Sequence, residues 1–340
     1  MKFSIRHLAV LSLSSLLIAA GCGNNNASTN TGSSTNTSAT ATAEAPTAPA
    51  SHKLNIKVSF YPMYEFTKNI TGDLADVEAL IPPGIEPHDW EPTAQDMAQI
   101  TKADVLVYNG AGMESWVDQV LDSASGSKLV SVEASKGLDI MEGAEEEEDE
   151  HGHAHEEGDD HHHDHGGLDP HVWLDPALAV KEVRNIEAAL AAAAPEHAGD
   201  FKANADAYIS KLEALDQEFR EVTKKVKRKD FITQHAAFGY LAKEYGLTQV
   251  PIAGLSPEEE PSAAKMAEIV EFAKTHNVKT IFFETLVSSS VADTIAKEIG
   301  AKTAVLNPIE GLTEEDRSHN LDYLGIMRQN LEALKIALNE

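Results

Sequence analysis

From residue 54 onward, short runs rich in β-branched and aromatic residues alternate with segments of helical periodicity. This alternation predicts α/β lobes with parallel sheets, because parallel strands need a crossover helix between them. The first stretch predicts strands at 54–60, 77–81, 105–109 and 128–132, with helices at 63–71 and 92–102. The second predicts strands at 230–233, 249–253, 280–283 and 303–306, with helices at 236–245, 262–276, 288–299 and 320–338.

Two helical segments without an intervening strand separate these stretches. The first is rich in alanine, covers about 176–194 and ends at Pro195. The second carries apolar residues at helical spacing over about 199–227, and 29 residues span roughly 40 Å in a helix. A helix of that length can join two lobes. We therefore expect the following organisation: an N-terminal α/β lobe at 53–197, a connecting helix at 198–228 and a C-terminal α/β lobe at 229–340.

The N-terminus has the pattern of an export signal. Lys2 and Arg6 precede an apolar run at 8–20, which is shorter than the about 20 residues that a bilayer requires. We predict a signal peptide at 1–21. Small residues precede Cys22, as in the cleavage sites of bacterial lipoproteins, so Cys22 is the expected lipidation site; a plain secretory signal is the alternative. Residues 22–52 are rich in Asn, Ser, Thr, Ala and Pro and predict a flexible tether.

Composition excludes several classes of protein. The chain has 55 Asp and Glu against 27 Lys and Arg, a net charge of −28, which argues against a nucleic-acid partner. Hydrophobic residues make up 42% of the sequence, enough for a substantial core. The single cysteine excludes a disulfide framework, an iron–sulfur cluster and a cysteine-based zinc site.

Much of the acidity lies in one insert, which we expect to be a disordered loop at 142–167. Residues 142–165 contain 12 carboxylates and seven of the 15 histidines. The seven histidines are His151, His153, His155, His161, His162, His163 and His165. Clustered imidazoles in a mobile chain offer weak, exchangeable metal sites, so the insert is a candidate low-affinity zinc antenna. The alternative is a solvated loop that binds metal incidentally.

Four possible metal ligands lie in loops where a site would form. His88, His235 and Glu284 follow predicted strands, and His171 lies in a turn before a helix. Binding crevices of open parallel sheets lie beyond the carboxyl ends of the strands. Three imidazoles and one carboxylate would suit tetrahedral zinc. Each histidine alone could instead be structural, and Glu284 could cap the helix that follows it.

Five motifs in order identify a family. They are Pro-His-Asp-Trp-Glu-Pro at 87–92, Asp-Pro-His-Val-Trp-Leu-Asp-Pro at 169–176, His-Ala-Ala-Phe-Gly-Tyr at 235–240, Gly-Leu-Ser-Pro-Glu-Glu-Glu-Pro-Ser at 254–262 and Phe-Glu-Thr at 283–285. With them, residues 54–340 resemble the cluster A-I metal-binding lipoproteins of bacterial ABC importers, most closely the zinc-specific ZnuA/AdcA group. The resemblance implies two α/β lobes joined by a rigid helix, with a metal ion in the cleft between them.

The resemblance also implies the ligands. His88, His171 and His235 match the family's three histidines, and Glu284 matches the carboxylate of the AdcA-like members. Other members use a slightly later Asp or a water molecule. Asp293 is the nearest such residue here, although it lies inside a predicted helix.

The implied function is an extracytoplasmic receptor that captures Zn²⁺ and delivers it to a membrane permease with a cytoplasmic ATPase. The protein would be a lipid-anchored monomer at the cell membrane and not an enzyme. Manganese importers of the family carry a Glu where this chain has His235, and imidazole favours zinc over manganese. Two alternatives stay within the family: a manganese receptor, or a surface protein for zinc sequestration or adhesion. A zinc hydrolase with Glu284 as base would need an open coordination position.

Overall fold

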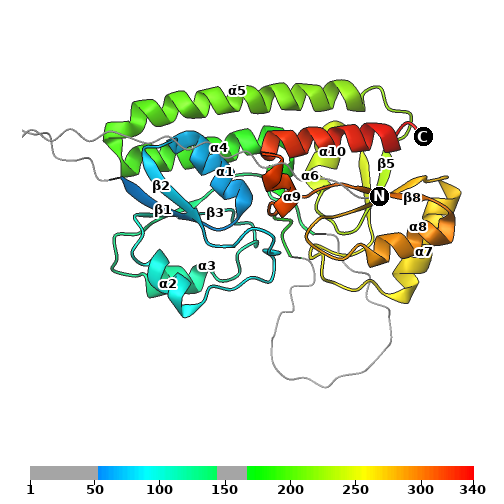
Figure 1. The fold of residues 1–340 in the computed structure, drawn as a ribbon, viewed down its shortest axis with the longest axis horizontal. Coiled ribbons are helices and arrows are strands. Elements are labelled where there is room, and N and C mark those ends of the chain that lie inside the picture. The colour runs from blue at the N-terminus through cyan, green and yellow to red at the C-terminus, as the bar shows by residue number, and fades with distance from the viewer. Residues whose placement is uncertain (1–52, 144–166) are drawn as a thin grey trace, which may run out of the picture. The chain divides into compact units, whose positions relative to one another are not determined.

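The computed structural model describes residues 53–143 and 167–340, which belong to one compact unit (Figure 1). Two four-stranded parallel sheets form its two lobes, with strand orders β2-β1-β3-β4 and β6-β5-β7-β8. The fold class expected from the strand–helix alternation is thereby confirmed. Cys22 and the seven histidines of the acidic insert lie outside the described residues.

The first lobe begins with the sheet and ends with a pair of packed helices. Its elements are β1 (Leu54–Val58), α1 (Tyr61–Thr71), β2 (Ala75–Ala79), α2 (Ala94–Ile100), β3 (Val105–Tyr108), α3 (Val117–Ser123) and β4 (Val130–Glu133). The turn η1 (Val172–Leu174) leads into α4 (Pro176–Ala193), and η2 (Pro195–His197) leads into the long α5 (Ala198–Thr223). Asp175 caps α4 by accepting a hydrogen bond from the Ala177 amide at 2.8 Å, and Pro176 provides a first helical residue with a suitable φ.

The second lobe repeats the alternation of strands and helices, and its last helix contacts the first lobe. Its elements are β5 (Asp230–Thr233), α6 (Gly239–Tyr245), β6 (Thr248–Pro251), α7 (Ala263–Thr275), β7 (Thr280–Phe283), α8 (Ser290–Ile299), β8 (Lys302–Val305), α9 (Glu314–Ser318) and α10 (Tyr323–Ala337). Figure 1 shows α10 beside α5, running from the side of the first lobe back over the second lobe to the C-terminus. The Tyr323 ring at the start of α10 reaches Phe66 of α1, with ring centroids 5.2 Å apart.

One hydrophobic core continues through both lobes. The buried face of α5 carries Phe201, Tyr208, Leu212, Leu215 and Phe219 at helical spacing. These side chains share a core with residues of both sheets. Burying each such side chain contributes about 1.5–3 kcal/mol, so α5 fastens the lobes firmly to each other. No helix among the described residues is long and apolar enough to cross a membrane.

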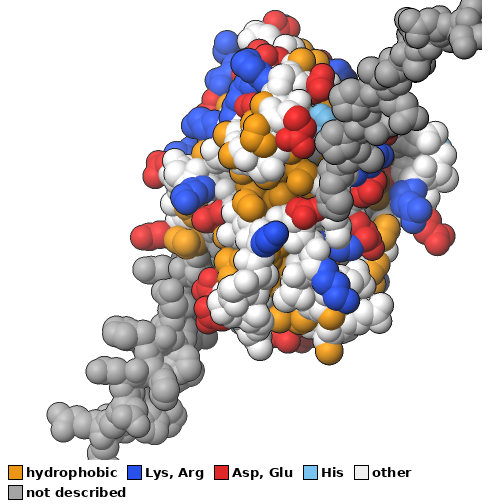
Figure 2. All heavy atoms as spheres, turned by 90° about the vertical axis from the view of Figure 1, so that its left-hand side faces the viewer, with side chains coloured by type: hydrophobic (Ala, Val, Ile, Leu, Met, Phe, Trp, Pro, Cys, Tyr) orange, Lys and Arg blue, Asp and Glu red, His pale blue; other side chains and the backbone are white. Residues whose placement is uncertain are grey.

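Charges of both signs lie on the face that Figure 2 shows. Basic side chains gather at its upper left, and acidic, basic and hydrophobic side chains are mixed over the rest. This face therefore lacks the continuous basic surface that nucleic-acid binding requires.

Candidate metal centre

Three histidines and one glutamate converge between the lobes. One ligand atom from each of His88, His171, His235 and Glu310 lies within 4.8 Å of all the others. The Nε2 atom of His171 is 3.3 Å from Nε2 of His88 and 3.3 Å from Nε2 of His235. Glu310 Oε1 is 3.2 Å from Nε2 of His88 and 3.4 Å from the corresponding atoms of His171 and His235. A tetrahedral zinc ion with bonds of about 2.0–2.1 Å holds its ligand atoms about 3.3 Å apart.

Only one of the four side chains is appreciably exposed to solvent. The side chains of His171 and His235 are fully buried and that of Glu310 is 1% exposed, whereas the side chain of His88 is 10% exposed. His88 therefore lies nearest to solvent. Burying most of a group of three imidazoles and a carboxylate is costly unless its members are paired or bind a cation.

Outer carboxylates orient the two buried histidines. Asp169 Oδ1 lies 2.8 Å from His171 Nδ1 and accepts a hydrogen bond from the His171 amide at 3.0 Å. Glu284 Oε1 contacts His235 Nδ1 and accepts from the His235 amide at 3.2 Å. Such partners favour the proton on Nδ1 and turn Nε2 toward the point where the four ligand atoms converge.

Glu310 is presented by a tightly held loop that follows β8. Trp173 donates from Nε1 to the Pro308 carbonyl at 2.8 Å, and Asn307 Oδ1 accepts from the Ile309 amide at 2.7 Å. Ile309 adopts a φ of 60°, which is costly for a β-branched residue. The surrounding hydrogen bonds keep this backbone in place, and so they fix where the Glu310 carboxylate points.

Attraction between the histidines and the carboxylates shifts their pKa values and so sets which of them are charged. Burial disfavours a charged imidazole, but the charge of Glu284 and hydrogen bonds to Glu284 and Glu310 outweigh burial and raise the pKa of His235 to about 10. Burial likewise opposes the rise in the pKa of His171, and its contacts with Asp169 and Glu310 overcome it. Burial would raise the pKa of Glu310, yet hydrogen bonds with the three histidines hold that pKa well below its usual range. Without a cation, the centre therefore attracts protons.

The structure brings together the three histidines that the sequence singles out, but not Glu284. The Glu284 carboxylate lies on the Nδ1 side of His235, outside the group of converging atoms, and Glu310 is the carboxylate inside it. Glu284 follows β7 directly and ends up behind His235, whereas the longer loop after β8 lets Glu310 reach the Nε2 atoms. Glu310 also follows a strand, so a search that extended five residues past β8 would have found it.

Asp293, which the family resemblance offers as another possible ligand, and the tryptophans Trp173 and Trp90 have structural roles. Asp293 lies in α8 and accepts a hydrogen bond from Ser289 Oγ at 2.9 Å. Trp173 packs between His171 and Phe60, with ring centroids 5.2 and 4.9 Å away. Trp90 packs against Trp116 at 5.5 Å. Neither tryptophan contributes an atom to the group.

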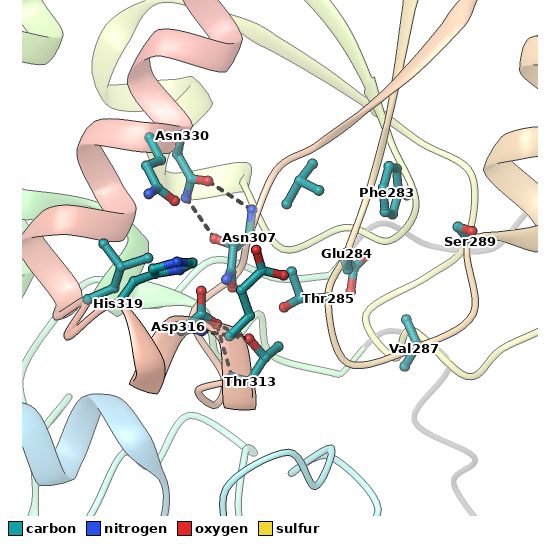
Figure 3. A pocket seen from close by; sticks show the side chains of 14 residues that line it. Phe283, Glu284, Thr285, Val287, Ser289, Asn307, Thr313, Asp316, His319 and Asn330 are labelled. Atoms are coloured by element: carbon teal, nitrogen blue, oxygen red, sulfur yellow. Dashed lines mark hydrogen bonds between the residues drawn. The ribbon is translucent and has the colours of Figure 1, made fainter. Parts of the chain in front are cut away.

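A hollow of about 530 Å³ lies in the second lobe next to Glu284 (Figure 3). Its walls include Thr285, Asn307, Asp316 and His319, and none of the three converging histidines lines it. Glu284 thus stands between this hollow and His235.

A family model and a curated relative both match most of the chain. The family model described as "Zinc-uptake complex component A periplasmic" (ZnuA) matches residues 56–337. The "High-affinity zinc uptake system protein ZnuA" of Bacillus subtilis is 56% identical over 286 residues, which cover 84% of this chain and 88% of that protein.

Two streptococcal comparisons add a longer relative and a solved structure. The "Zinc-binding lipoprotein AdcA" of Streptococcus pneumoniae is 49% identical over 286 residues, or 84% of this chain, and the chain spans only 56% of that protein's length. The crystal structure of the Zn(II)-bound ZnuA-like domain of Streptococcus pneumoniae AdcA has a TM-score of 0.72 and 43% sequence identity. That match covers 85% of this chain and 100% of the domain.

Proposed function

The chain belongs to the ZnuA family of zinc-uptake components, and from this premise we propose that it is the high-affinity zinc receptor of an ABC importer. It would capture Zn²⁺ outside the cytoplasm and deliver it to a membrane permease. The observation that supports this most directly is the tetrahedral spacing of four ligand atoms between the lobes. The names of its relatives, a zinc uptake protein and a zinc-binding lipoprotein, support the same function.

We propose His88, His171, His235 and Glu310 as the four zinc ligands. Three neutral imidazoles and one carboxylate balance one of the two charges of the ion and complete a tetrahedron. A complete tetrahedron leaves no position for a catalytic water, which favours binding over hydrolysis. In this assignment Glu284 acts through His235 and does not contact the ion.

The same geometry suggests how the ion enters and leaves. His88 is the ligand with the most exposed side chain, and its loop is held locally by a hydrogen bond from its own amide to Glu86 Oε1 at 2.9 Å. The other three ligands are fixed by buried partners. Zinc would therefore pass by His88, and movement of that loop would open the site for release.

The partners follow from the proposed receptor function. We propose docking onto a permease that is driven by a cytoplasmic ATPase, with the receptor acting as a monomer tethered through a lipid on Cys22. The likeness to a zinc-binding lipoprotein supports the anchor. A manganese receptor is less consistent with the site, because imidazole-rich sites favour zinc and carboxylate-rich sites favour manganese.

The direct test is a titration of the purified protein with zinc and with manganese against a competing chelator, beside His235→Ala. The proposal predicts one tight zinc site, much weaker manganese binding and a large loss of zinc affinity in the variant. Equal affinity for both metals would contradict the zinc assignment, and an unaffected variant would contradict the site. Loss of zinc-dependent uptake after gene deletion would separate a transport receptor from a protein that only sequesters zinc.

A further inference from the structure

Tyr240 connects the segment that carries His235 to the segment that carries His171. It lies in the first turn of α6, five residues after His235, and is 3% exposed. Its hydroxyl donates a hydrogen bond to the Asp169 carbonyl at 2.8 Å and accepts one from the Met141 amide at 2.8 Å. A single side chain of the second lobe thus holds two backbone groups of the first.

These bonds close a ring around the residue that orients His171. The Asp169 amide donates to the Met141 carbonyl at 2.8 Å, so Tyr240, Met141 and Asp169 are bonded pairwise. The Asp169 carboxylate in turn contacts the Nδ1 atom and the amide of His171. The position of the His171 ring therefore depends on where the Tyr240 hydroxyl holds the Asp169 backbone.

Gly239, the residue before Tyr240, shows independently that α6 lies very close to Asp169. A Cβ atom on Gly239 would lie 2.9 Å from Asp169 Oδ2. Real Cβ contacts of that length essentially do not occur, so a larger side chain would displace the carboxylate. Glycine at this position allows α6 to approach Asp169 directly.

We propose that Tyr240 is a positioning residue for zinc, acting as a latch between the His171 and His235 segments. The latch is the pair of hydrogen bonds from its hydroxyl to Met141 and Asp169. By fixing the Asp169 backbone relative to α6, it sets the separation and the angle of two ligands that come from different lobes. This inference rests on the proposed zinc-receptor function and extends it to a residue that does not touch the ion.

The chain offers a matched control on the same helix. Tyr245 ends α6, is 6% exposed, and donates its hydroxyl to Asp216 Oδ1 on α5 at 3.0 Å. Tyr245→Phe and Tyr240→Phe each remove one buried hydroxyl and its hydrogen bonding. Both are expected to lower the melting temperature, but only Tyr240→Phe should disturb the metal centre.

The experiment compares the full chain with both variants. It measures zinc affinity by chelator competition and ligand geometry by the visible absorption of bound cobalt. Loss of an outer partner typically weakens metal binding about 10–100-fold. We expect a loss of about that size in Tyr240→Phe with changed cobalt bands, and less than about a twofold effect in Tyr245→Phe. If Tyr240→Phe matched the wild type in zinc affinity and cobalt spectrum, the latch would be refuted.

A second variant tests the same contact without removing the hydroxyl. Gly239→Ala should press on Asp169 and weaken zinc binding in the same direction, so it carries the test if Tyr240→Phe does not fold. Unchanged zinc binding by a folded Gly239→Ala variant would count against the latch. Weak zinc binding by the wild-type chain would instead contradict the receptor function, which keeps the two failures distinct.

Discussion

Glu310 Oε1 lies 3.2 Å from His88 Nε2, although the two residues are 222 positions apart in the sequence. His88 follows β2 in the first lobe and Glu310 follows β8 in the second. Theirs is one of several contacts between side chains that follow the strands of the two sheets and converge on the same centre. A metal ion held there is bound by both lobes at once, so its affinity depends on how the lobes are held together.

Glu310 and Glu284 should differ in their effects on zinc binding. Glu310→Ala removes a proposed ligand, so its affinity loss should exceed the about 10–100-fold typical of an outer partner. Glu284→Gln keeps a hydrogen-bonding group beside His235 Nδ1 and should stay within that range. Chelator competition with both variants measures the difference. A larger loss in Glu284→Gln than in Glu310→Ala would make Glu284 the better candidate for the ligand.

Zinc binding should strengthen as the pH rises. The pKa of His235 is raised to about 10, so the zinc-free centre holds a proton at neutral pH that must leave before Nε2 can bind zinc. Each proton released makes the apparent affinity rise about tenfold per pH unit below that pKa. Competition titrations between pH 6 and pH 8, with calorimetry in two buffers to count released protons, check this. An affinity that does not change over this range would contradict it.

The same proton should affect the stability of the zinc-free protein in the opposite direction. A pKa raised above the unfolded value of 6.5 contributes stability that is complete below pH 6.5 and is lost as the pH rises toward about 10. The melting temperature of the zinc-free protein should therefore fall over this range by more than that of His235→Ala. Equal slopes for the two proteins would show that His235 is not the group responsible.

Glu182 should make the first lobe less stable at higher pH. It is fully buried in α4, and neither carboxylate oxygen has a hydrogen-bond partner. Burial, together with the charges of Glu114 and Asp175, raises its pKa well above the ordinary value. Because the unfolded chain ionises above pH 4.5 and the folded chain only at the raised pKa, stability falls by about 1.4 kcal/mol per pH unit between these two pKa values.

Glu182→Gln removes this titration without changing the size of the side chain. Urea unfolding between pH 5 and pH 8 should give a flatter pH dependence for the variant, with the greatest gain in stability at pH 8. Zinc affinity should not change, because neither Glu182 oxygen is hydrogen-bonded to any of the four ligands. A pH dependence parallel to that of the wild type would show that Glu182 ionises in the folded protein as it does in the unfolded one.

Trp173 should link the stability of the lobe junction to the position of Glu310. Trp173→Phe leaves the Pro308 carbonyl without its donor, which costs about 1–3 kcal/mol for a buried acceptor. Because Pro308 is two residues before Glu310, zinc affinity should fall as well. Trp116→Phe is the control: its ring is buried against Trp90 in the first lobe, so it should lower stability alone. Equal zinc affinity in both variants would show that Trp173 does not position the Glu310 loop.

Local patterns predicted the elements of this fold where they were long or strongly periodic. The apolar spacing of Phe201, Tyr208 and Leu215 identified the long α5, and the β-rich runs identified the eight strands found among the described residues. The short helices α3 and α9, of seven and five residues, were missed because so few turns carry little periodic signal. Helix α6 starts at Gly239 and not at residue 236, since the His235 carbonyl, which would accept the first helical hydrogen bond, accepts from Thr233 Oγ1 at 2.8 Å and Gln249 Nε2 at 2.9 Å.

The site was harder to predict than the fold. His88, His171 and His235 could be found because each lies in a distinctive motif or directly after a strand. Which carboxylate joins them depends on how far the loop after β8 reaches, and that is set by long-range contacts such as Trp173 with Pro308. The position of Tyr240 against Asp169 likewise follows from the packing of α6 on the other lobe, which no local pattern records.

The most direct test of the central claim is anomalous diffraction at the zinc absorption edge from crystals of the zinc-loaded protein. We predict one strong peak between the lobes, about 2.0–2.2 Å from Nε2 of His88, His171 and His235 and from a carboxylate oxygen of Glu310. A principal peak elsewhere, or an ion bound by Glu284 in place of Glu310, would contradict this account.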